Sequence, residues 1–144
     1  MTPEDFLTSE EEQRIVQAIK DAEYNTSGEI RVHLESVNQN PTMEHAWEIF
    51  DKIGMFQTLQ RNGVLFYLDI NHKVFTVIGD EGINKVVPDN FWDSIKILVI
   101  QNFRKGKFAD GLVAGIKEVG DKLSTYFPYQ SDDVNELPDE ISKN

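Results

Sequence analysis

The sequence predicts one α/β domain built on a small mixed β-sheet flanked by helices. Segments whose apolar residues recur at helical spacing alternate with short β-rich segments, which is typical of this class. The first and second β-segments are separated by a helix, whereas the second and third are separated only by a short turn. We therefore expect a right-handed parallel crossover followed by an antiparallel hairpin.

The first helix is expected over residues 9–24. Thr8 precedes Glu11 by three residues, which is a capping-box pattern, and apolar residues then recur at helical spacing up to Ala22. Residues 29–35 alternate polar and apolar side chains with period two, which predicts a first strand with one covered face.

A second helix is expected between Thr42, a capping residue, and Gly54, a helix stop. Residues 63–68 form a nearly continuous β-prone run, which indicates a strand buried on both faces. After a turn at residues 69–72, residues 73–78 resume the strand pattern and predict the return strand of a hairpin.

The second half of the chain is expected to be mostly helical, with helices over residues 91–103 and 108–126. Residues 131–144 are acidic and lack periodicity, so we expect a C-terminal tail that is peripheral or mobile. The predicted organisation is therefore one domain over residues 1–130 and an acidic tail over residues 131–144.

Composition narrows the classes of function. The 144 residues carry a formal net charge of −11, which repels nucleic acid and anionic membrane surfaces and attracts divalent cations or a basic protein partner. There is no cysteine, which excludes thiol chemistry and fits a reducing compartment. The N-terminal residues are acidic, and no apolar signal core or membrane span follows them. We therefore expect a monomeric, cytoplasmic protein that does not enter a membrane.

The acidic loop at residues 79–82, flanked by glycines, is the strongest candidate for a site. In the expected topology, the starts of the first two strands and the end of the third lie at one edge of the sheet. The polar residues expected to meet there are Glu29, Arg61, Asn62, Asp80 and Glu81. Asp89 and Asp93, before and at the start of the next helix, are expected to join them. Ca²⁺ and Mg²⁺ bind such oxygen ligands, and the alternative is a turn whose acids satisfy only local backbone groups.

The opposite edge holds a second, looser set of polar residues, namely Glu35, Ser36, Asp69 and His72. Ligands of open α/β sheets usually bind at the carboxyl ends of parallel strands, which favours this edge. The three histidines have no partner at zinc-ligand spacing, and we interpret them as surface or half-buried side chains. No phosphate-binding glycine loop occurs in the sequence.

Four short segments, taken in order, make the chain resemble the TPM domain family, named after thylakoid lumen and related membrane-associated proteins. They are SGEIRV at residues 27–32, NGVL at 62–65, VIGDEGI at 77–83, and FRKGKF at 103–108 with Gly111 after it. The resemblance covers nearly the whole chain and is greatest to short cytosolic bacterial members. It implies a three-layer α/β/α sandwich with a mixed sheet, binding of divalent cations, calcium in particular, and in some members an acid phosphatase activity.

The resemblance also bears on individual residues. The family often has an aspartate just before the Asn-Gly pair that opens the second strand, where this chain has Arg61. That departure removes a candidate ligand and places a cation beside the site. Asp89 matches an aspartate that commonly precedes the next helix, and Asp80 matches the short bacterial members.

Three hypotheses of function follow. The first is a regulatory or interaction module in which bound Ca²⁺ or Mg²⁺ orders the loop after the third strand for a protein partner. The second is a metal-assisted acid phosphatase, in which Asp80, Glu81 and Asp89 hold the ion. Arg61 would then clamp the phosphate as the candidate catalytic residue. The third is an interaction domain whose acidic residues 132–136 contact a partner without a metal.

Overall fold

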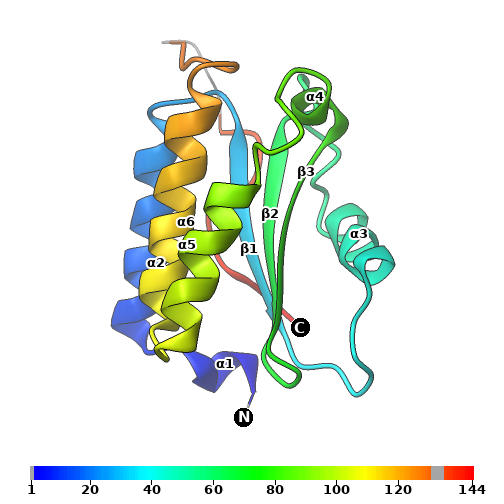
Figure 1. The fold of residues 1–144 in the computed structure, drawn as a ribbon, viewed down its shortest axis with the longest axis vertical. Coiled ribbons are helices and arrows are strands. Elements are labelled where there is room, and N and C mark those ends of the chain that lie inside the picture. The colour runs from blue at the N-terminus through cyan, green and yellow to red at the C-terminus, as the bar shows by residue number, and fades with distance from the viewer. Residues whose placement is uncertain (1, 131–134) are drawn as a thin grey trace.

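The computed structural model describes residues 2–130 and 135–144 (Figure 1). Its helices are α1 (Pro3–Phe6), α2 (Ser9–Glu23), α3 (Met43–Lys52), α4 (Glu81–Asn84), α5 (Asp93–Arg104) and α6 (Phe108–Leu123). Its strands are β1 (Glu29–Glu35), β2 (Gly63–Asp69), β3 (Val74–Gly79) and β4 (Ser142–Lys143). None of the described helices is both long and apolar enough to cross a bilayer.

The four strands form one mixed sheet in the order β3-β2-β1-β4. β1 and β2 are parallel, with Glu29 opposite Gly63, and β2 and β3 are antiparallel, with Val64 opposite Gly79. The predicted crossover and hairpin are therefore confirmed. Every residue of β2 is buried, as its continuous apolar run indicates.

Helices cover both faces of the sheet, so the fold is the expected three-layer α/β/α sandwich (Figure 1). Ile30 and Val32 of β1 face the layer formed by α2, α5 and α6, whereas Leu65 and Tyr67 of β2 face α3. The two cores are separate because successive side chains of a strand point to opposite faces. The odd-numbered residues of β1, which include Glu29 and the other polar positions, therefore lie on the α3 face.

The capping box predicted at the start of α2 is present. The backbone N–H of Glu11 donates to Thr8 Oγ1 at 3.1 Å, and the backbone N–H of Thr8 donates to Glu11 Oε1 at 2.9 Å. A cap of this kind stabilises a helix by about 1 kcal/mol. α6 ends at Leu123, earlier than predicted, and the chain then turns so that Thr26 and Pro128 form an isolated β-bridge.

α6 lies close to α2 and α5 because glycines occupy the two contacts. A Cβ added to Gly120 would lie 2.7 Å from the Cβ of Ala22, and one added to Gly115 would lie 2.5 Å from Val99 Cγ2. Larger side chains at these positions would push the helices apart. This close approach completes the larger of the two cores.

The C-terminal residues do not form the peripheral tail that their composition predicts. Residues 135–144 lie against the sheet, where β4 pairs in parallel with β1 and Leu137 is buried beneath α3 side chains. A two-residue strand is too short to show a period, so the sequence pattern could not reveal it. Residues 131–134, which include most of the acidic segment proposed to contact a partner, lie outside the described residues.

Candidate functional site

The sheet edge predicted to hold a cation site exists in the backbone, but it is divided in two. Glu29 pairs with Gly63, and the backbone N–H of Asp80 donates to the Gly63 carbonyl at 2.9 Å, so the three residues lie side by side. The chain at Met55 covers the middle position, because a Cβ on Gly63 would lie 2.9 Å from the Met55 carbonyl oxygen. Glu29 and Asp80 consequently line different pockets.

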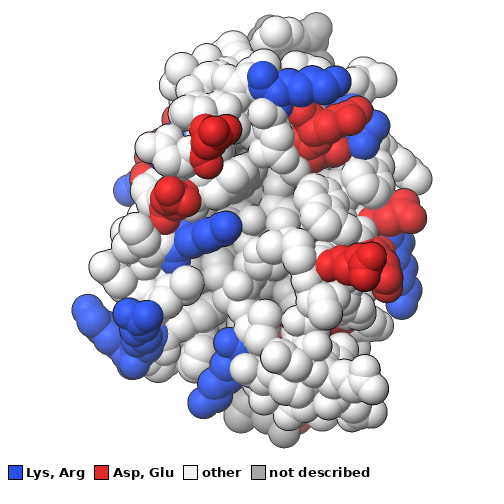
Figure 2. All heavy atoms as spheres, turned by 45° about the vertical axis from the view of Figure 1, so that its right-hand side comes forward, with Lys and Arg blue, Asp and Glu red and all other residues white. Residues whose placement is uncertain are grey.

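On the β3 side, Arg61 neutralises the acidic loop. Its Nε and Nη2 donate to the two carboxylate oxygens of Asp80 at 2.7 and 3.0 Å, and its Nη1 lies 3.1 Å from Glu81 Oε1. Asp80 also accepts from the backbone N–H of Glu81 at 2.7 Å and so caps α4. Figure 2 shows a patch of mixed acidic and basic side chains at this end of the molecule. A carboxylate that is paired in this way is a poor ligand for an added cation, because the cation must compete with a guanidinium.

The other predicted ligands make no side-chain hydrogen bond or ion pair with Arg61, Asp80 or Glu81 in the part of the chain that the structure describes. Asp89 and Asp93 are exposed, and their side chains form no hydrogen bond or ion pair with the described residues. Asn62 is buried, and neither its Oδ1 nor its Nδ2 has a hydrogen-bond partner in the part of the chain that the structure describes. Within residues 2–130 and 135–144, no three His, Asp or Glu side chains are grouped so that they could hold a metal ion as they stand.

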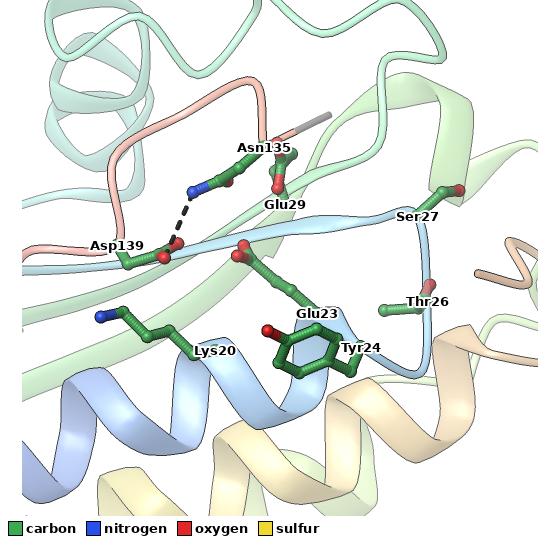
Figure 3. A pocket seen from close by; sticks show the side chains of 8 residues that line it. All are labelled: Lys20, Glu23, Tyr24, Thr26, Ser27, Glu29, Asn135 and Asp139. Carbon is green, nitrogen blue, oxygen red and sulfur yellow. Dashed lines mark hydrogen bonds between the residues drawn. The ribbon is translucent and has the colours of Figure 1, made fainter. Parts of the chain in front are cut away.

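On the β1 side, Glu29 lines a cavity of about 350 Å³, which we call the acidic pocket (Figure 3). Its walls come from the end of α2, the loop into β1 and the C-terminal segment, and they comprise Lys20, Glu23, Tyr24, Thr26, Ser27, Glu29, Asn135 and Asp139. Figure 3 shows the carboxyl groups of Glu23, Glu29 and Asp139 pointing into the same space. Three acids from three parts of the chain thus meet in one pocket.

Backbone amides hold two of these carboxyl groups in place. Glu23 Oε2 accepts from the backbone N–H of Ile30 at 3.0 Å. Glu29 Oε1 accepts from the backbone N–H groups of Glu136 and Leu137, the latter at 3.2 Å. Glu29 therefore joins the start of β1 to the C-terminal segment, and both glutamates have defined positions.

Three carboxyl groups and one basic side chain, that of Lys20, line the acidic pocket. Burial, together with contact with the carboxyl groups of Asp139 and Glu29, raises the pKa of Glu23 to about 11. Burial also raises the pKa of Glu29. Asp139 Oδ2 accepts from Asn135 Nδ2 at 3.2 Å, but its Oδ1 is buried with no partner among the described residues. At neutral pH the carboxyl group of Glu23 therefore keeps its proton.

Sequence reasoning identified Glu29 but not Glu23 or Asp139. A signal for Glu23 exists, because it follows Ile15 and Ile19 at intervals of four and so ends the buried stripe of α2 with an acid. Asp139 has no comparable signal. It lies in a segment without periodicity, whose position is set by tertiary contacts such as the burial of Leu137.

The opposite edge of the sheet holds a second buried polar group, which we call the Glu35 network. The carboxylate of Glu35 accepts hydrogen bonds from Tyr67 Oη, His45 Nε2 (2.5 Å), His33 Nε2 (3.1 Å) and Asn144 Nδ2 (3.3 Å). Burial acts to raise the pKa of Glu35, but these hydrogen bonds outweigh it and lower the pKa below its ordinary value. The interpretation of the histidines as surface or half-buried is wrong for His33, which is 2% exposed and whose Nδ1 contacts Ser142 Oγ at 2.8 Å.

Asp69, beside this network, is also satisfied within the chain. It accepts from the backbone N–H of Val37 at 3.0 Å and from His72 Nδ1 at 2.6 Å, which fixes the turn after β2. Ser36 is exposed. At the carboxyl ends of the parallel strands, the buried carboxylates of Glu35 and Asp69 therefore already have hydrogen-bond partners within the chain. The acidic pocket differs in this respect, because the buried Oδ1 of Asp139 has no partner among the described residues.

This architecture places the chain in a class of small α/β/α domains with solved representatives. The NMR structure of the BA42 protein from the psychrophilic bacterium Bizionia argentinensis matches with a TM-score of 0.93 and 48% identity, over 99% of this chain and 98% of that chain. The N-terminal domain of a P. gingivalis protein matches with a TM-score of 0.70 and 19% identity, over 89% and 84%. The N-terminal domain of the cg2496 protein from Corynebacterium glutamicum matches with a TM-score of 0.65 and 17% identity, over 89% and 80%. The last two likenesses show the fold alone.

The family model described as TPM domain matches residues 1–122, which is most of the chain. The chain therefore belongs to the TPM domain family, and the resemblance carried by its four short segments is confirmed. No protein with a curated description matches the chain.

Proposed function

We propose that the protein binds a divalent cation, Ca²⁺ or Mg²⁺, in the acidic pocket, and that binding holds the C-terminal segment against β1. The supporting observation is that Glu23, Glu29 and Asp139 meet in one part-buried pocket, where burial raises the pKa of both glutamates. A cation would displace the proton that Glu23 otherwise holds at neutral pH. Calcium binding is also what the resemblance to the TPM family implies.

The chemistry of the pocket suits a hard cation. Ca²⁺ and Mg²⁺ bind carboxylate, carbonyl and hydroxyl oxygens, and the walls offer the side-chain oxygens of Ser27 and Asn135 beside the three carboxyl groups. A cation would also satisfy the buried, unpartnered Oδ1 of Asp139. The site predicted on the β3 side has weaker support, because Arg61 already occupies the carboxylate of Asp80.

The three acids are not already arranged as a ligand set, so binding requires their carboxyl groups, including that of Asp139, to shift. Asp139 belongs to the segment that Glu29 holds through the backbone N–H groups of Glu136 and Leu137. Movement of Asp139 would therefore tighten this segment. The proposed role is regulatory, since cation binding would set how firmly residues 135–144 are held and which surface a protein partner meets.

Calorimetric titration with Ca²⁺ and with Mg²⁺ tests the proposal. Because each bound ion displaces the proton of Glu23, the affinity should rise by at least about tenfold between about pH 6 and about pH 8. The measured heat should also depend on the ionisation enthalpy of the buffer. Thermal unfolding at the higher pH should show a raised Tm in millimolar Ca²⁺, because the ion binds the folded chain.

Two variants and a matched control locate the ion. Glu23→Gln and Asp139→Asn should each weaken binding by about tenfold or more, because each removes a carboxylate ligand. Asp93→Asn removes an exposed acid from α5, and this variant should bind the ion as the wild type does.

NMR of isotope-labelled protein tests the location independently. Ca²⁺ should shift the signals of backbone amides in residues 20–30 and 135–139. Shifts confined to residues 79–93 would contradict the acidic pocket and favour the β3 side.

A metal-assisted acid phosphatase is the alternative hypothesis, and the geometry favours it less. Arg61 would have to release Asp80 and Glu81 before it could clamp a phosphate. A phosphomonoesterase assay of the wild type and Arg61→Ala tests this alternative, because activity that is present in the first and lost in the second would support it.

The expectations of a monomer and of a cytoplasmic location rest on the sequence. Size-exclusion chromatography would test the first, and cell fractionation would test the second.

A further inference from the structure

A large apolar cavity lies at the end of the molecule opposite the acidic pocket. It has a volume of about 790 Å³, within the range of ligand-binding cavities, and it lies between the β2–β3 hairpin and the ends of α1, α5 and α6. Eight of its ten lining residues are apolar, namely Phe6, Leu68, Ile70, Val74, Phe75, Ile100, Phe103 and Phe108. We call it the phenylalanine cavity.

Four phenyl rings form a connected wall of this cavity. The ring centroids of Phe6 and Phe108 are 4.9 Å apart, those of Phe108 and Phe103 are 5.0 Å apart, and those of Phe103 and Phe75 are 5.4 Å apart. All four rings are only half-buried, and Ile100 is 37% exposed. Packed aromatic rings that stay open to solvent leave apolar surface that a ligand could cover.

The two polar residues that line the cavity are both cations. Lys73 and Arg104 are exposed, and neither forms an ion pair with any residue that the structure describes. Arg104 begins the basic run that continues with Lys105 and Lys107, which are likewise exposed. Figure 2 brings the β3 side of the molecule forward and shows basic side chains gathered toward the lower left of that view. In a chain of net charge −11, this local excess of unpaired positive charge favours an anion.

We infer that the phenylalanine cavity binds an anionic amphiphile, namely a free carboxylate with an alkyl chain. The chain would lie against the phenyl rings, and the carboxylate would pair with Lys73 and Arg104 at the rim. The acidic side chains of α1, Glu4 and Asp5, are not among the residues that line the cavity. The FRKGKF segment at residues 103–108 would then contribute to ligand binding, because it supplies the rings of Phe103 and Phe108 and the rim cation Arg104.

Titration of labelled protein with decanoate, below its critical micelle concentration, tests the inference. Saturable binding should shift amides of residues 68–75 and 100–108. Decyltrimethylammonium has the same alkyl chain with a positive head group and should bind at least about tenfold more weakly, because it loses both ion pairs. Equal affinity for the two probes would overturn the inference, as would the absence of saturable decanoate binding.

Variants separate the head-group and chain contacts. The double variant Lys73→Glu and Arg104→Glu should weaken decanoate binding by about tenfold or more, whereas Lys117→Glu, an exposed reversal on α6, should not. Ile100→Trp, at a partly exposed wall position, should weaken binding by filling the cavity and leave the rim charge unchanged. Binding to anionic vesicles without binding of free decanoate would overturn the inference in favour of a membrane-docking surface.

Discussion

Two glutamates at opposite ends of one strand, Glu29 and Glu35, lie in opposite electrostatic surroundings. Both are buried, and burial by itself disfavours the charged form of each. Glu35 meets four hydrogen-bond donors and its pKa is lowered, whereas Glu29 meets the acid Glu23 and the pKa of both is raised. Hydrogen-bond donors therefore outweigh the effect of burial on the pKa at Glu35, whereas burial prevails at Glu29. One end of β1 is internally paired, and the other gathers three carboxyl groups beside one lysine, Lys20, which is where we propose the cation.

The two ends of β1 should respond to pH in opposite directions. The folded-state pKa of Glu23 lies above its ordinary value of 4.5, so its contribution to stability is complete below about pH 4.5 and is lost as the pH rises toward about 11. The folded-state pKa values of Glu35 and His33 are lowered, so their contributions are present at high pH and are lost as the pH falls. Acid should loosen the Glu35 network, and alkali should loosen the acidic pocket.

Of the three changes predicted below, removal of the Glu35 carboxylate should change the free energy of unfolding most. Glu35→Ala should lower the free energy of unfolding by about 3 kcal/mol, because it leaves buried His33 and Tyr67 without their acceptor. Urea unfolding at neutral pH measures the change. Glu48→Ala removes an exposed carboxylate 3.9 Å from His45 and should change stability by less than about 0.5 kcal/mol. Equal losses in the two variants would show that the network does not stabilise the fold.

Neutralising Glu23 should have an intermediate effect of opposite sign. Glu23→Gln should raise the free energy of unfolding by about 1 kcal/mol at about pH 8, and the difference should vanish near about pH 4, where the unfolded wild type is protonated at this position as the folded one is. Urea unfolding at the two pH values measures this dependence, and Glu48→Gln should show none. A variant less stable than the wild type at the higher pH would mean that the Glu23 carboxylate is charged and stabilising.

Removing the hydroxyl group of Ser142 should change the free energy of unfolding least. Ser142→Ala removes the oxygen beside His33 Nδ1 and should cost about 1 kcal/mol or less, since one hydrogen bond at the sheet edge is lost. Amide hydrogen exchange should accelerate at β4 more than at the β2–β3 hairpin. Ser36→Ala, at an exposed position of the same edge, is the control and should leave exchange at β4 unchanged. Uniform acceleration would indicate global destabilisation instead.

Local patterns were enough to predict most of the secondary structure. Residues 29–35 alternate because one face of β1 packs on three helices, and the capping hydroxyl of Thr8 starts α2 where expected. The crossover and hairpin followed from the order of these elements, and so did the meeting of Glu29 and Asp80 at one edge. β4 could not be predicted, because a strand of two residues has no periodicity.

The sequence by itself determined the longer helices and strands, their order and the family, because caps, periods and short motifs depend on neighbouring residues. Only the tertiary structure decided which acids share a pocket. Met55 covers Gly63 and separates Glu29 from Asp80, while the C-terminal segment brings Asp139 to Glu23. The physical reason is that the charge of a buried acid depends on groups distant in sequence, whose positions follow from packing rather than from local pattern.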